Sequence, residues 1–190
     1  MPRSIRALAV AVVCAGVMAP VAPAVVIKTN WNELQTYGNG TRSVRLYVRQ
    51  IEVRAGTWKA WVGVTNRSTQ KIGLVAREER QLNGPYSYWA GPGLWWAARV
   101  PGGSWWPDAS ATITRSVKAE IRPAYVTSLA PKKSWFGTFS GTTARLPKDR
   151  LLRVGFGLIQ IPGTSVDLQG NPLKHEVPLS TTHQFRLPKR

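Results

Sequence analysis

The chain has 190 residues, a formal net charge of +17 and nine tryptophans. Its length suits one domain behind an export signal, and its single cysteine, Cys14, excludes an intrachain disulfide. The positive charge favours polyanionic partners or acidic surfaces through long-range attraction, and it carries no information about the fold.

Residues 1–24 have the three-part layout of an export signal. Arg3 and Arg6 supply the positive start, and the apolar run that follows is too short to cross a hydrocarbon core of ~30 Å as a helix. Small residues then lead up to Ala24, after which we expect cleavage. Residues 25–190 would form one domain without a transmembrane segment, secreted or associated with the cell envelope. An uncleaved N-terminal anchor is the alternative.

Beyond this signal the apolar residues recur with a period of two, which predicts strands. The alternation across 44–48 changes parity at Gln50, as a β-bulge would produce. In the segment 57–66, Trp58 falls on the apolar face, so the nearby Trp61 must point to the other face.

Further strands are expected downstream, at 71–76, 110–118, 134–141, 151–161 and 181–187. Gly155 and Gly157 share one strand face, where an aromatic ring such as that of Trp135 or Phe139 could lie across the backbone. No window has the pattern of a capped amphipathic helix. The sequence therefore predicts an all-β fold, a single antiparallel β-sandwich of about eight to ten short strands separated by Gly, Pro and Asn turns.

The run WKAWVGVTNRSTQKIGL, residues 58–74, resembles the strand, Asn-x-Ser turn and following strand of immunoglobulin-like domains in secreted bacterial proteins. The resemblance implies an immunoglobulin-like sandwich. It implies no binding site, because the disulfide-pinned core of that fold is absent and a shared fold does not carry a shared site.

A tryptophan-rich stretch at 86–108 holds five of the nine tryptophans among glycines and prolines, and we expect it to form a hairpin or loop region. With the turn at 101–103, Arg99 would face Trp105 across the hairpin. Alternation then places Trp95, Arg99 and Trp105 on an open face and the neighbouring Trp96 in the core.

The open face of this hairpin is the first candidate site, with Trp89 extending it. Trp89, Trp95 and Trp105 around Arg99 are suited to stacking on sugar rings or nucleobases. The alternative is that an adjoining loop covers Trp95 and Trp105 as a satellite apolar cluster.

A basic stripe, Arg42, Arg45, Tyr47 and Arg49, is the second candidate. Alternation puts the last three on the solvent side of one strand, where they could follow an anionic wall polymer, an anionic glycan or a nucleic acid. The alternative is an edge strand protected by charge against association with other sheets.

Recognisable catalytic patterns are missing. The only histidines are His175 and His183, and the start of a zinc-protease motif at His175 lacks its second histidine. We therefore expect no metal, no cofactor and no enzymatic activity. The leading hypothesis is a basic binding or envelope-associated module attracted to anionic polymers or surfaces. A carbohydrate-binding module using exposed tryptophans is the alternative, and a secreted hydrolase is the remote one.

Overall fold

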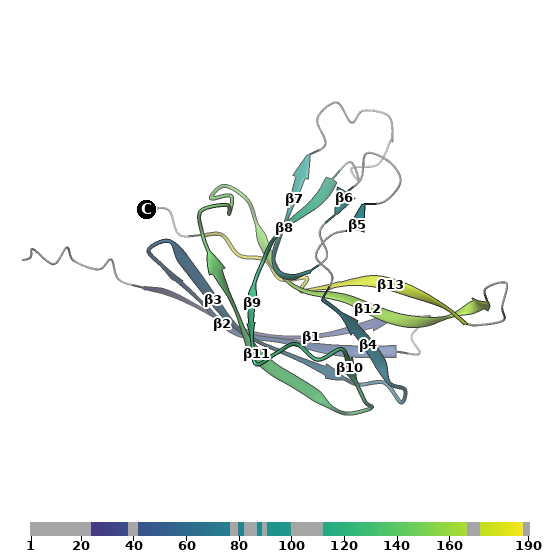
Figure 1. Cartoon of the computed structure of the whole chain (residues 1–190). Coiled ribbons are helices and arrows are strands. Elements are labelled where there is room, and N and C mark those ends of the chain that lie inside the picture. The colour runs from purple at the N-terminus through teal and green to yellow at the C-terminus, as the bar shows by residue number, and fades with distance from the viewer. Residues whose placement is uncertain are drawn as a thin grey trace, which may run out of the picture.

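The computed structural model describes residues 24–37, 42–76, 80–81, 87–88, 91–99, 112–166 and 172–187. These residues form an all-β structure in which two antiparallel sheets pack face to face (Figure 1), so the predicted β-sandwich is confirmed. Within the described ranges no helix is long and apolar enough to cross a membrane.

The first sheet has five strands in the order β1-β2-β3-β11-β9, spanning Val25–Tyr37, Arg42–Arg54, Thr57–Asn66, Ser134–Thr142 and Glu120–Arg122. The ladder between β2 and β3 shifts register between Val48 and Gln50, where the change of parity predicted a bulge. Trp58 is buried on the inner face of β3, while Trp61 points outward and is half-buried. This sheet therefore follows the alternation closely.

The second sheet has six strands, β10-β4-β12-β7-β8 with β13 on the other side of β12; they span Ser128–Leu129, Ile72–Val75, Leu152–Val166, Pro92–Arg99, Thr112–Lys118 and Pro172–Ser180. A separate pair is formed by β5 (Arg80–Gln81) and β6 (Ser87–Tyr88). The strand expected at 181–187 reduces to one bridge, between Phe185 and Leu152. The strand that pairs with β12, from Gly155 to Val166, is instead β13, which was not predicted from the sequence.

The core between the sheets is rich in aromatic side chains. Trp58, Phe139 and Phe156 are among the largest fully buried residues. The Tyr125 hydroxyl donates a hydrogen bond of 2.6 Å to the Phe156 carbonyl, and burial raises the pKa of Tyr125 above its usual value. Aromatic rings contribute large apolar areas, which suits a domain without a described disulfide.

Asn66 closes the corner between β3 and β4. Its side chain is fully buried and donates to the carbonyls of Gln70 (2.7 Å) and Leu129 (3.0 Å). Its Oδ1 accepts from the backbone and the hydroxyl of Ser68. The Asn-x-Ser turn predicted from the sequence is therefore a buried hydrogen-bonded corner, in which every polar atom of the amide has a partner.

A ring does cover one of the two β12 glycines, but it is a different ring from the two predicted. The indole of Trp95 lies against Gly155, so closely that a β-carbon at Gly155 would overlap it. Trp135 and Phe139 instead stack on each other in the main core. The prediction of a covered glycine was correct, and the choice of ring was wrong because β7, not β11, pairs with β12 at this point.

Candidate functional site

The predicted open face of the tryptophan-rich stretch is not open at Trp95. This residue is only 4% exposed, packs with Leu158, and donates from its indole to the Gly91 carbonyl at 2.8 Å. The expectation of exposure was wrong because both faces of β7 are covered here, with Trp96 half-buried against the main core as expected. The satellite cluster weighed as the alternative is what forms around Trp95.

The predicted pairing within that hairpin is also corrected. Arg99 lies opposite Thr112 in the β7–β8 ladder, not opposite Trp105, so the connection between the paired strands is longer than a three-residue loop. Trp89 and Trp105 lie outside the described residues, and so does the side chain of Arg99.

The basic stripe on β2 divides in the structure. Arg42 faces inward, is 9% exposed, and donates from Nη2 to Gln70 Oε1 at 2.6 Å, so it is not available to a polymer on the outer face. Arg45 and Tyr47 are half-buried on the outer face and Arg49 is exposed, as alternation predicted. The outward part of the stripe therefore remains a candidate site.

The strand register extends this stripe into rows of side chains across the sheet. Tyr47 on β2 lies opposite Gly63 on β3, which in turn lies opposite Phe136 on β11. The Phe136 ring extends over Gly63, and its centroid lies 5.7 Å from that of Tyr47. Because Gly63 has no side chain, two rings from different strands meet above it. Phe136 remains 58% exposed.

The next row holds another aromatic ring and a guanidinium group. Trp61 on β3 lies opposite Thr138 on β11, which lies opposite Arg122 on β9. The Lys59 ammonium sits 5.0 Å from the Trp61 ring centroid, within the range of a cation–π contact. Arg49 is the unpaired residue within the register shift of β2, and its neighbour Gln50 lies opposite Trp61, so the bulge places Arg49 beside this row.

These two rows enclose a groove of about 630 Å³ on the outer face of the five-stranded sheet, hereafter the aromatic groove. Its walls include Tyr47, Trp61 and Phe136, with Arg49 and Arg122 as its cations. Within the described part of the chain, no carboxylate pairs with either arginine. An apolar floor beside unpaired guanidinium groups can stack on a flat ring and bind an anion at the same time.

Sequence reasoning missed three members of the aromatic groove, namely Trp61, Phe136 and Arg122. Alternation did place Trp61 on the face opposite Trp58. The same alternation within 134–141 puts Phe136 on the outer face of its strand, because the adjacent Trp135 is buried on the inner face. The pairing of β3 with β11, which brings them together, is a contact between residues far apart in the chain, and no local pattern indicates it.

A second cluster of titratable groups joins β1 to the C-terminal segment. Glu33 accepts hydrogen bonds from Thr182 N (2.7 Å), Thr182 Oγ1 (2.9 Å) and His183 Nδ1 (2.6 Å). Burial alone would raise the pKa of Glu33, but the hydrogen bonds from Thr182 and His183 outweigh it and lower the pKa below its usual value. The His183 ring also stacks on the Trp31 ring, with 5.3 Å between the two ring centroids. This carboxylate therefore ties β1 to the C-terminal segment through Thr182 and His183.

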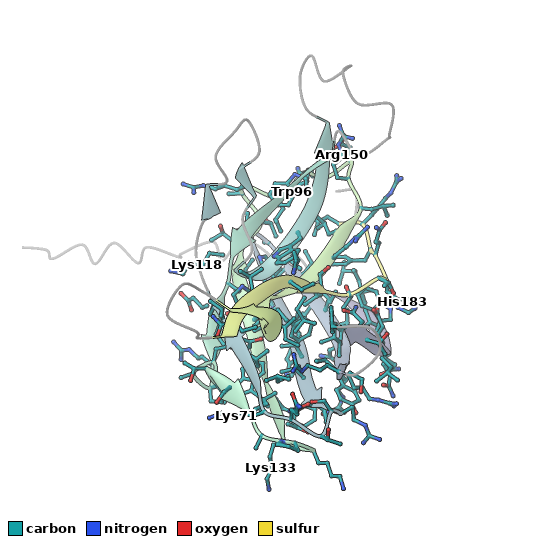
Figure 2. All side chains as sticks on the ribbon, turned by 90° about the vertical axis from the view of Figure 1, so that its right-hand side faces the viewer. Lys71, Trp96, Lys118, Lys133, Arg150 and His183 are labelled. Carbon is teal, nitrogen blue, oxygen red and sulfur yellow. The ribbon has the colours of Figure 1, made fainter. Side chains whose placement is uncertain are left out.

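Positive charge is also spread over the rest of the molecule. Figure 2 shows Lys71 and Lys133 at one end of the domain and Arg150 toward the opposite end, with Lys118 on a further side. Such a dispersed charge attracts polyanions generally, and it does not select one groove. The aromatic groove is therefore distinguished by its rings.

In comparisons with protein-family models, curated proteins and solved structures, nothing matches this chain. Among the residues described, no group of three or more His, Cys, Asp or Glu side chains could hold a metal ion.

Proposed function

We propose that this protein is a non-catalytic binding module that holds an anionic polymer against the aromatic groove. One observation carries the proposal, the meeting of three aromatic rings with Arg49 and Arg122 in a single open groove. The guanidinium groups attract and orient the anionic groups of the polymer, and the rings supply contact area that salt does not screen. The dispersed positive charge brings the polymer to the domain.

We further propose that the chain is exported and works outside the cell or at its envelope. The export-signal layout of residues 1–24 supports export. A strongly basic domain outside the cell or at its envelope would meet anionic surface polymers. N-terminal sequencing of the protein recovered from outside the cells is expected to begin at Val25. An intact Met1 terminus would instead indicate an uncleaved anchor.

The decisive test separates the aromatic groove from general charge. A double variant, Arg49→Gln with Arg122→Gln, removes both groove cations, and Lys71→Gln with Lys133→Gln removes the same charge from the end of the domain seen in Figure 2. We expect the arginine variant to lower the slope of log affinity against log salt by about two for a heparin oligosaccharide. Equal effects of the two variants would contradict a specific groove.

A second variant tests the aromatic contribution. Phe136→Ala removes a ring that is more than half exposed, so the fold should persist. The ring contacts the apolar face of a sugar, and this contribution depends on buried area and little on salt. We expect weaker heparin binding at every salt concentration with an unchanged salt slope. Undiminished affinity would show that charge alone retains the ligand.

The alternative of a carbohydrate-binding module built on Trp89, Trp95 and Trp105 has lost one ring, because Trp95 is buried. A hydrolase remains the remote alternative, and turnover of esterase, glycosidase or nuclease substrates would support it.

A further inference from the structure

A second cavity adjoins the aromatic groove and differs from it in charge. It has a volume of about 610 Å³, and Trp61 lines both cavities. Its walls include Glu52, Lys59, Ser140 and Glu120. The two cavities therefore lie on either side of one tryptophan on the same sheet.

The register shows how the acidic groups reach this position. Glu52, Lys59, Ser140 and Glu120 lie opposite one another in one row across four strands. This row is two residues along the strands from the row of Trp61, a separation of about 6.5–7 Å. Arg49 and Arg122 are thus followed, one row further, by a cavity whose two carboxylates, Glu52 and Glu120, are balanced by the cations Lys59 and Arg54. Of these, Glu52 bonds to Arg54 at 2.5 Å.

We propose that the polymer is an acidic glycan in which charged sugars alternate with uncharged ones. The inference rests on the proposed function and narrows its ligand. A charged sugar occupies the aromatic groove, with its carboxylate or sulfate on Arg49 and Arg122 and its ring against Trp61. The uncharged sugar lies in the second cavity, where Glu52 and Glu120 accept hydrogen bonds from its hydroxyl groups.

Charge complementarity favours this ligand over a polymer that is charged at every unit. A nucleic acid carries a phosphate on each nucleotide, so a strand crossing both cavities would bring a phosphate into the second cavity, where Glu52 and Glu120 offset the charges of Lys59 and Arg54. That cavity offers no net positive charge to compensate the desolvation of the phosphate, and its two carboxylates disfavour an anion at short range. Sugar hydroxyl groups meet carboxylates as hydrogen-bond donors, with no such repulsion.

The test compares three probes on the full chain by titration calorimetry at one salt concentration. They are a hyaluronan octasaccharide, in which glucuronate alternates with N-acetylglucosamine, an oligogalacturonate of eight residues and an oligothymidylate of eight residues. We expect hyaluronan to bind about tenfold more tightly than either other probe, although it carries about half their charge. Tighter binding of oligothymidylate or oligogalacturonate would overturn the inference.

The double variant Glu52→Gln with Glu120→Gln provides an independent arm. We expect hyaluronan to bind about tenfold more weakly, the loss expected for a hydrogen bond to a charged group, and oligothymidylate to bind more tightly. If the glutamate variant binds all probes more tightly, the inference of an alternating glycan is overturned. The proposed function would still stand if Arg49→Gln with Arg122→Gln reduced binding of the same probes. If the arginine variant changes nothing for any probe, the proposed function fails as well.

Discussion

Replacing Asn66 with alanine should be among the most damaging single changes in this domain. The fully buried amide donates to the Gln70 and Leu129 carbonyls and accepts from the backbone and hydroxyl of Ser68. In the variant, the Gln70 carbonyl and the Ser68 hydroxyl still bond to each other at 2.8 Å. The Ser68 N–H and the Leu129 carbonyl lose the partner that Asn66 supplies.

Two buried polar groups deprived of a partner cost about 1–3 kcal/mol each, so we expect Asn66→Ala to lower the free energy of unfolding by about 4 kcal/mol. Ser68→Ala is the matched control. Asn66 Oδ1 then keeps the Ser68 N–H, and the Gln70 carbonyl keeps the Asn66 amide, so the loss should be only about 1 kcal/mol.

Urea denaturation measures both losses. With a slope of about 2 kcal/mol per molar urea, the midpoint should fall by about 2 M for Asn66→Ala and about 0.5 M for Ser68→Ala. A midpoint shift for Asn66→Ala no larger than that for Ser68→Ala would refute the reasoning, because the corner would then gain nothing from the amide.

Three further predictions concern single sites. The pKa of Glu33 is lowered on folding, so its stabilising effect is present above its unfolded value of 4.5 and is lost as the pH falls below it. The gap in urea midpoint between the wild type and Glu33→Gln should therefore narrow between about pH 6 and about pH 3. Gly155→Ala should cost about 1–3 kcal/mol in chemical denaturation, because the buried Trp95 ring cannot move away. Gly63→Ala meets the exposed Phe136 ring, which can swing outward, so it should leave the midpoint nearly unchanged and weaken heparin binding.

The sequence predicted the five-stranded sheet well where one face of a strand is buried and the other meets solvent. In β2 and β3 a period of two separates the two faces, and the change of parity at Gln50 marks a real shift in register. Alternation could not decide whether the Trp95 side chain is exposed, because it assigns residues to two faces without saying which face is covered. At Trp95 and Trp96 both faces of β7 are covered, and the glycine in the neighbouring strand was the local sign of it.

The strand β13 shows a second limit of local patterns. Proline normally interrupts a strand because it lacks an N–H donor, and β13 contains Pro172 and Pro178. The structure places β13 at the side of β12, outside the path formed by the other five strands of that sheet. Proline is tolerated at an edge, so the tertiary position reversed the local expectation.

The candidate site was harder to predict than the fold because it is assembled across strands. Tyr47, Trp61 and Phe136 each follow from alternation as outward residues, but their meeting depends on β11 lying beside β3 and on Gly63 leaving space between them. The core does not use these three outward rings, because buried side chains such as Phe139 on β11 already pack between the two sheets. An exposed aromatic surface contributes little to the stability of the fold, and it increases the risk of association with other chains. Such a surface lies beside Arg49 and Arg122, for which the described residues supply no carboxylate, and this arrangement is the basis of the proposed binding role.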